Sequence, residues 1–280
     1  MKQTLKPAAI IAILFLAIAS VSAQTIKRTI SKADTLDFGP GGTLSVTGAP
    51  NGSIRVEGWN KGQVEVNAEI EITANTEAEL DQIAKVTGFI LDESVGRTDI
   101  ITVGTFDKSY MKRVAKKFPK ELLGLPFRID YVIKVPRYCD LQIDGGKGDL
   151  YVAGVDGSMK INFLDSNAKL DLVGGGVLAT FGGGTVDINV PTKSWRGRFA
   201  DISLASGVMN VTLPSSLNAE IDASILRNGK IDNTYADLKP KTRKDVFTDK
   251  LITAKSGAGG IPLKFTVGDG SLKISEIKKP

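Results

Sequence analysis

Residues 158–190 of the 280-residue chain read SMKINFLDSNAKLDLVGGGVLATFGGGTVDINV. Short stretches of alternating apolar and polar residues are separated there by glycine, asparagine, aspartate or serine, the residue types that favour turns. The pattern continues through the second half of the sequence, where successive apolar pairs or triplets start ten residues apart on average. Short strands at such regular spacing indicate an all-β protein, either a β-solenoid or an antiparallel β-sandwich.

The strand length and the glycines favour the solenoid over the sandwich. A sandwich needs longer strands joined by hairpins, whereas stacked coils accept two or three inward residues per strand and use glycine where the backbone turns a corner. Two strands per coil give a repeat of about 18–20 residues, close to known solenoid repeats. The residues expected to point inward are Leu141, Ile143, Leu150, Val152, Met159, Ile161, Phe163, Leu170, Leu172, Ala179, Phe181, Val186, Ile188, Val190, Ile202, Leu204, Met209, Val211, Leu213, Ile221, Ala223 and Ile225.

The first half of the sequence combines alternating segments with one helix. Apolar and polar residues alternate at residues 44–46, 54–56 and 64–72, which predicts half-buried strands. Thr76 and Glu79 have the spacing of a capping box, and apolar residues follow at helical intervals. One short helix is therefore expected in this half of the chain.

Residues 1–23 have the features of a signal peptide. Lys2 and Lys6 precede an almost wholly apolar run, and Val21-Ser22-Ala23 offers small residues for cleavage before Gln24. The run is shorter than the roughly 20 residues that cross a bilayer, which argues against the alternative of a membrane anchor. No later apolar run reaches that length, and no cysteine stands directly after the cleavage site to carry a lipoprotein anchor. We predict an exported protein with no transmembrane segment in the mature chain, located in the periplasm, at the cell surface or outside the cell.

The mature chain is expected to form one domain with two parts. Residues 24–136 form a strand-rich part with the helix and a basic insertion at 107–126, and residues 137–280 form the repetitive part. The insertion contains the densest positive charge of the mature chain, carried by Lys108, Lys112, Arg113, Lys116, Lys117 and Lys120. Apolar residues lie between these bases, so a short amphipathic helix could offer lysines to an anionic lipid, an anionic glycan or another envelope polymer. The alternative is a solvated loop or a helix that caps the end of the β-stack.

The composition removes most catalytic and metal-binding mechanisms. The sequence has no histidine and one cysteine, Cys139, which excludes Ser-His and Cys-His catalysis, thiolate zinc sites and intrachain disulfides. The net charge of +5 falls to +3 once Lys2 and Lys6 are removed, too little to indicate a nucleic-acid binder. We expect no catalytic residue and no cofactor, and we expect Cys139 to pack at a strand edge rather than to pair between molecules.

The glycine clusters at residues 174–176 and 182–184 are better explained as corners than as phosphate loops. Neither cluster is followed by a helix or by the Lys-Ser pair of a phosphate-binding loop. Residues 145–149 faintly resemble a calcium-binding repeat, but Lys147 would repel a cation and the motif is not repeated. No metal site is therefore expected.

Aspartates recur at or near the expected turns. Solvated turn residues explain them best, but Asp144, Asp149, Asp165 and Asp171 could stack and supply the paired carboxylates of a glycan-active β-helix enzyme. The full set is Asp144, Asp149, Asp156, Asp165, Asp171, Asp187 and Asp201.

Glycine turns that lead into short strands recur at residues 51–59 (NGSIRVEGW), 135–136, 141–143, 148–154 (GDLYVAG), 257–263 (GAGGIPL) and 270–274 (GSLKI). These stretches resemble the bacterial putative-adhesin family, a domain of unknown function in exported proteins. The resemblance spans nearly the whole mature chain and implies a right-handed single-stranded β-helix, but it carries over no functional residue. With the composition, it indicates a non-catalytic envelope or surface protein, an adhesin or a scaffold. The alternatives are a polysaccharide lyase or hydrolase and an accessory domain in envelope signalling.

Overall fold

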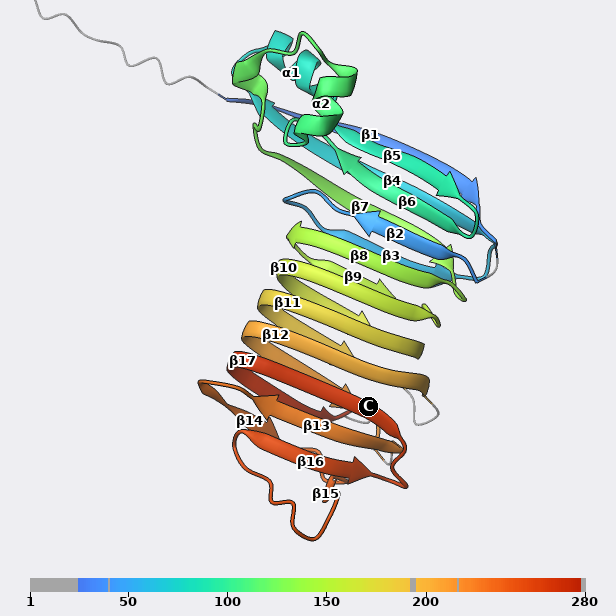
Figure 1. Cartoon of the computed structure of the whole chain (residues 1–280), viewed down its shortest axis with the longest axis vertical. Helices are drawn as coiled ribbons and strands as arrows, with labels where there is room; N and C mark the ends of the chain where they lie inside the picture. The colour runs from blue at the N-terminus through green and yellow to red at the C-terminus, as the bar shows by residue number, and fades with distance from the viewer. Residues whose placement is uncertain (1–24, 40, 192–194, 216, 278–280) are drawn as a thin grey trace, which may run out of the picture.

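The computed structural model describes residues 25–39, 41–191, 195–215 and 217–277, so the expected signal peptide and Gln24 lie outside the described residues. Within these ranges the chain forms one seventeen-stranded sheet (Figure 1). The strands are β1 (Ile26–Asp37), β2 (Thr43–Thr47), β3 (Ile54–Trp59), β4 (Gln63–Ala74), β5 (Gly88–Ser94), β6 (Arg97–Val103), β7 (Phe127–Pro136), β8 (Asp140–Lys147), β9 (Leu150–Ala153), β10 (Ser158–Asp171), β11 (Gly174–Asn189), β12 (Arg196–Leu213), β13 (Ala219–Ile225), β14 (Gly229–Asn233), β15 (Lys239–Pro240), β16 (Leu251–Ser256) and β17 (Ile261–Glu276). The helices are α1 (Glu77–Ala84), α2 (Lys108–Val114) and the 3-10 turn η1 (Lys120–Leu122).

The repetitive part is a parallel stack. Met159 of β10 pairs with Leu141 of β8 and with Val177 of β11, a step of 18 residues in each direction. The first half of β10 pairs with β8 and its second half with β9, and pairing along both halves of the strand continues through β11, β12 and β17. We call each such level of backbone a rung. The step lies within the expected repeat, and parallel pairing does not fit the antiparallel sandwich considered as the alternative.

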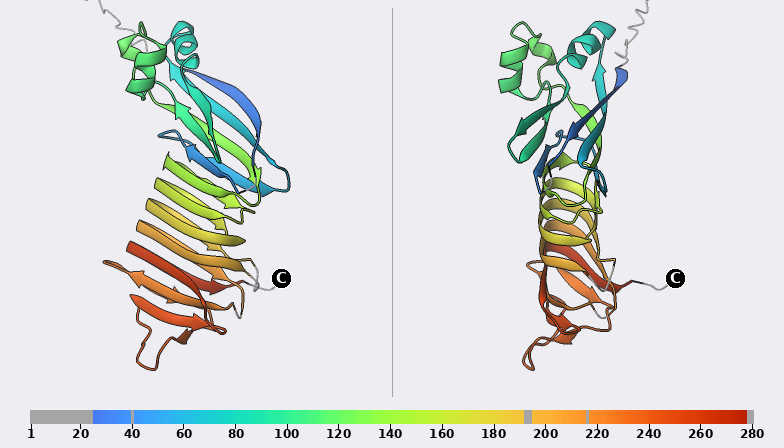
Figure 2. Two further views of the ribbon diagram at one scale, coloured as in Figure 1. Left: turned by 45° about the vertical axis from the view of Figure 1, so that its right-hand side comes forward. Right: turned by 90° about the vertical axis from the view of Figure 1, so that its right-hand side faces the viewer.

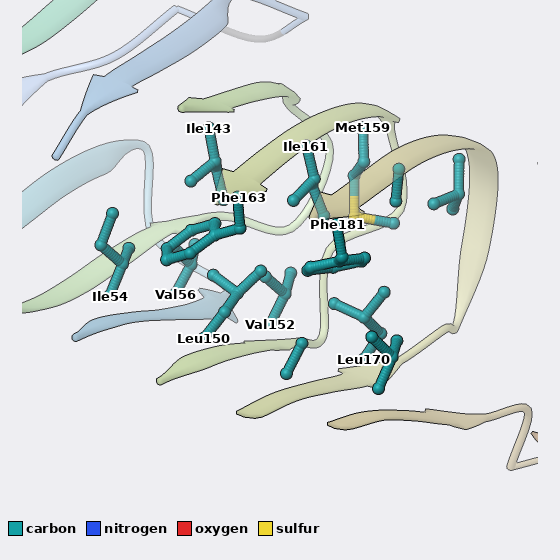
Figure 3. Close-up of a cluster of buried hydrophobic side chains, with 14 of the residues drawn as sticks. Ile54, Val56, Ile143, Leu150, Val152, Met159, Ile161, Phe163, Leu170 and Phe181 are labelled. Carbon is teal, nitrogen blue, oxygen red and sulfur yellow. The ribbon is translucent and has the colours of Figure 1, made fainter. Parts of the chain in front are cut away.

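The two halves of each rung form opposing faces with the apolar core between them. Ile143 and Ile161 on one face and Leu150 and Val152 on the other point into a shared interior (Figure 3). The alternation of buried and exposed positions along β10 to β12 follows from the period of two of a strand. Every residue expected from the sequence to point inward is buried, so that prediction is confirmed.

Glycine at the bend between the two faces allows neighbouring rungs to lie in contact. Gly207 of β12 is in register with Gly184 of β11 and with Gly270 of β17. Its φ is +138°, and a Cβ at this position would lie 1.9 Å from the carbonyl oxygen of Gly184. Gly184 and Gly175 also have positive φ, which confirms the corners predicted for the two glycine clusters of β11.

Spatial order differs from chain order at both ends of the stack. The rung of β2 and β3 lies against β8 and β9, although β4 to β7 intervene in the sequence. At the other end, β17 lies between β12 and the rung of β13 and β14, and it pairs in parallel with both.

The expectation of parallel coils throughout residues 137–280 is wrong for β15 and β16. β16 runs antiparallel to β13, and β15 runs antiparallel to β16. The reason is that the segment after β14 brings the chain to the end of β13, where Leu251 pairs with Ser224, so β16 runs back along β13.

The opposite end of the molecule carries both helices (Figures 1 and 2). α1 begins at the predicted capping box, in which the Thr76 hydroxyl accepts from the Glu79 N–H and the Glu79 carboxylate accepts from the Thr76 N–H. α2 is a second helix, which corrects the expectation of one short helix in this half of the chain and lies where the basic segment was considered as a short amphipathic helix. Its cap is Asp107, which accepts from the N–H groups of Ser109 and Tyr110, and the sequence lacks the glutamate that would complete a capping box.

Asp130 of β7 connects the helix-bearing end of the molecule to the rung of β2 and β3. Its carboxylate accepts from the Ser53 N–H at 2.7 Å and the Ser53 hydroxyl at 2.6 Å, and it forms an ion pair with Arg128 at 2.7 Å. Burial acts to raise the pKa of Asp130, but the hydrogen bonds from Arg128 and Ser53 outweigh it and hold the pKa below its usual value.

Candidate functional site

The basic segment folds as a closed excursion between β6 and β7. The N–H of Gly124 donates to the carbonyl of Thr105 at 3.0 Å, and the Thr105 hydroxyl donates to the carbonyl of Leu125 at 2.9 Å, so the two ends of the segment meet. Met111 of α2 and Leu122 of η1 are buried beneath it. Residues 104–125 together with α1 are called the head below.

All six bases predicted as anionic-ligand contacts lie on this head and are exposed. They are Lys108, Lys112, Arg113, Lys116, Lys117 and Lys120. Within the described ranges, none of the six forms an ion pair with a carboxylate. Lys112 and Arg113 also lie in the last turn of α2, where positive charge is favoured by the helix dipole. The structure therefore brings the predicted bases together and leaves their charge in solvent.

The acids of α1 do not neutralise these bases because they are engaged elsewhere. Arg28 of β1 donates to Asp81 at 2.7 Å and to Glu77 at 2.5 Å, and Glu79 accepts within the capping box. The hydrogen bond from Arg28 holds the pKa of Asp81 below its usual value. Lys85, which follows α1, is exposed and adds a seventh base to the head.

Two open hollows flank residues 115–118. The first, of about 730 Å³, lies between the C-terminal end of α1 and residues 113–119, and it is lined on the α1 side by Gln82, Lys85 and Val86. This hollow could not be predicted from the sequence, because some thirty residues separate its two walls and neither wall carries a recognisable motif.

The second hollow, of about 520 Å³, is called the lysine groove. Its apolar lining consists of Met111, Ala115, Phe118 and Leu123, and its basic lining consists of Lys108, Lys112, Lys116 and Lys120. No acidic side chain lines either hollow in the described part of the chain. Both volumes fall in the range of ligand pockets, about 300–1,000 Å³.

Large apolar side chains are also exposed on the head. Phe106, Val114 and Leu123 are 41%, 49% and 42% exposed. Such groups beside unpaired lysines make an amphipathic surface at one end of the molecule, while Met111 and Leu122 fix the segment to the protein. The segment therefore packs on the end of the sheet as a cap would, and its outer surface is exposed, basic and apolar as a binding element would be.

Among the turn aspartates, Asp149 and Asp165 line one small hollow of about 160 Å³ together with Lys147. Asp144, Asp171 and Asp187 accept from Asn162, Asn189 and Asn210 of the next rung at 2.8, 3.2 and 2.8 Å. The remaining two acids of the proposed stack, Asp149 and Asp165, face Asn167 and Gly183 across their rungs. None of the four acids suggested as a catalytic stack is in register with another, because each occupies a different column of the ladder.

The remaining features considered from the sequence are the single cysteine, a metal site and a membrane-spanning segment. Cys139 is buried, and burial raises the pKa of its thiol to about 12. Among the residues that the structure describes, no three His, Cys, Asp or Glu side chains are grouped so as to hold a metal ion. Within the same ranges, no helix is both long enough and apolar enough to span a bilayer.

The sequence matches no protein-family profile and no curated protein. Among solved structures, a putative cell adhesion protein from Clostridium sporogenes is similar at 12% identity over 89% of this chain and 100% of its own, with a TM-score of 0.48. A putative adhesin from Bacteroides fragilis shares 13% identity over 88% and 97% of the two chains, with a TM-score of 0.27. A putative lipid binding protein from Parabacteroides distasonis shares 10% identity over 89% and 97%, with a TM-score of 0.30. Because every TM-score is below 0.5, we transfer no function from these likenesses.

Proposed function

We propose that the protein is a non-catalytic, exported envelope or surface protein in which a right-handed β-solenoid carries an anion-binding head. Its role is that of an adhesin or scaffold. The β-stack supplies a rigid support, and the head supplies contacts to an anionic glycan, lipid or envelope polymer. The mature chain starts after residue 23 and is located in the periplasm, at the cell surface or outside the cell.

The solenoid is supported by the parallel register of 18 residues and by the bend that divides each rung into two faces. The right hand is supported by the general preference of crossover connections between parallel strands. A stack of this kind binds each rung only to its neighbours, so it forms an elongated and stiff frame (Figure 2).

A non-catalytic role is supported by the arrangement of the acids. Glycoside hydrolysis needs two carboxyl groups held on either side of one bond. Here Asp144, Asp171 and Asp187 are spread over separate rungs and each accepts from an asparagine amide. Asp149 and Asp165 share a small hollow, but Lys147 also lines it and Asp149 accepts from the Asn167 amide. That pattern is a ladder that stabilises the stack.

The observation that carries the proposal is the excess of basic charge on the head, where Asp107 and Glu121 are the only acids of the segment 104–125. Seven exposed bases gather around two hollows that no described acidic residue lines. A cap that only stabilised the fold would be more stable with acids paired to these bases. Arg28 shows such pairing elsewhere on the head, since it forms ion pairs with Glu77 and Asp81 of α1. A cleft lined by charge of one sign raises the local concentration of oppositely charged ligands, which is the property that an anion-binding head needs.

The proposal is tested by vesicle binding. The purified chain is mixed with vesicles of anionic phosphatidylglycerol or neutral phosphatidylcholine at low and high salt, and bound protein is measured by sedimentation. We expect binding to the anionic vesicles that weakens at least tenfold toward 1 M salt, where the screening length shrinks to about 3 Å. A variant with Lys112, Arg113, Lys116 and Lys117 changed to Gln should lose at least tenfold in affinity, since each base near an anionic surface contributes about 1 kcal/mol.

A second charge variant controls for net charge. Lys160, Lys230, Lys255 and Lys273 are exposed on the stack and are changed to Gln in the same number. This variant should bind as the parent does. Equal loss in the two variants would mean that overall charge drives binding, and the proposal of a binding head would fail. A soluble polyanion, polyglutamate, tests the same head without a bilayer.

A further inference from the structure

We propose that the lysine groove binds the acyl chain of an anionic amphiphile and that its lysines hold the charged headgroup. The inference rests on the proposed function, because the same head supplies the charge. It goes further in naming a hydrocarbon chain as part of the ligand.

The apolar lining of the groove carries the first step. Met111, Ala115, Phe118 and Leu123 offer a surface with no strong hydrogen-bond donor or acceptor. A sugar placed there would lose water from its hydroxyls without gaining partners, which is unfavourable. A hydrocarbon chain has no such groups, and its burial against this lining is favourable.

The charge at the groove carries the second step. Lys108 and Lys112 are four residues apart on one face of α2, Lys116 lies in the turn after the helix, and Lys120 begins η1. All four are exposed, so their ammonium groups reach solvent while their methylene stems cover the edges of the groove. A ligand that fits must therefore carry negative charge next to its chain.

Exposure of Leu123 carries the third step. This side chain is 42% exposed although it lines the groove, whereas Met111 beneath it is buried. An acyl chain in the groove would cover the exposed part of Leu123. Polar polyanions would contact the lysines and leave it uncovered.

The test compares four soluble probes by titration calorimetry below their micelle concentrations: dodecyl phosphate, octyl phosphate, inorganic phosphate and dodecyl maltoside. Each buried methylene strengthens binding by a factor of about four, so four extra methylenes that are partly covered should give at least a tenfold difference. We expect dodecyl phosphate to bind at least tenfold more tightly than octyl phosphate. Inorganic phosphate and neutral dodecyl maltoside should bind more weakly still.

Variants locate the chain. Leu123→Ser should weaken dodecyl phosphate binding at least fivefold and leave binding of polyglutamate unchanged, and Leu123→Met should restore most of the loss. Val246→Ser is the matched control, since Val246 is 76% exposed and lies in the segment between β15 and β16, at the opposite end of the molecule. Lys108→Gln with Lys112→Gln should weaken both alkyl phosphates by the same factor.

The outcomes separate this inference from the proposed function. Equal affinity for octyl and dodecyl phosphate, an unaffected Leu123→Ser variant, or polyglutamate binding as tight as that of dodecyl phosphate would overturn the acyl-chain inference. Salt-dependent binding to anionic vesicles would still support the head as an anion site. Failure of every anionic probe and vesicle would overturn both.

Discussion

Changing Gly207 to alanine tests whether the backbones of neighbouring rungs lie so close at this residue that no side chain fits between them. The new Cβ would lie 1.9 Å from the carbonyl oxygen of Gly184, whereas real Cβ atoms essentially never approach closer than 3.0 Å. The rungs must therefore move apart by about 1.1 Å at this point. A ladder hydrogen bond of about 2.9 Å would then stretch to about 4.0 Å and be lost. Two lost bonds cost about 1–3 kcal/mol, and the positive φ costs about 1–3 kcal/mol more.

Gly260 serves as a control that separates the cost of the steric contact from the cost of placing alanine at a positive φ. Gly260 has a φ of +117° but nothing within 4 Å of the position of a Cβ. Alanine at residue 260 should lower the free energy of unfolding by about 1–3 kcal/mol, and alanine at residue 207 by about 2–6 kcal/mol. The measurement is guanidinium unfolding followed by circular dichroism. Equal losses in the two variants would refute the argument that the rungs touch at Gly207.

Three further predictions concern the core, the thiol and the acid response. Ile188→Ala should lower the free energy of unfolding by about 2–5 kcal/mol because Ile188 is buried, whereas Asn189→Ala should change it by well under half of that. Cys139 should resist iodoacetamide at pH 8 in the native protein and react once guanidinium unfolds it, since burial raises its pKa to about 12. Asp130→Asn should destabilise the protein by about 1–2 kcal/mol at pH 7. Because the pKa of Asp130 is lowered by folding, its contribution is full above pH 5 and is lost as the pH falls below about 4, so the difference from the parent in denaturant midpoint should shrink there.

The inward side of the stack could be predicted from the sequence because a strand has a period of two. Once Ile161 and Phe163 are assigned to the core, Asn162 must face out, and no long-range information is needed. The corners at Gly175 and Gly184 were predictable for a similar reason, since positive φ is a local requirement.

The order of the rungs could not be predicted, because it depends on contacts between segments far apart in the chain. Leu263 of β17 pairs in parallel with both Ala200 and Ile221. The sequence around Leu263 would show the same alternation of apolar and polar residues if β17 had only one of these partners. The antiparallel direction of β16 is hidden for the same reason, since its alternation is that of any half-buried strand. The bases of the head were visible in the sequence, but the hollow they share with Lys85 was not.

The position of β17 separates the two ends of the molecule in a way that bears on function. The rung of β13 and β14 pairs with the rest of the stack only through β17 among the described strands, and β17 is the last strand in the sequence. That end of the stack therefore docks only once β17 is in place. The head is formed by residues before β7, and its supporting strands β6 and β7 pair with β2 and β3, which pair in turn with β8 and β9. In a stack where each rung stabilises only its neighbours, a change at β13 to β17 reaches the head through several intervening rungs and is weakened at each. The head and the end that completes the fold can consequently vary independently, which is what the proposed function, with contacts at one end of a rigid support, requires.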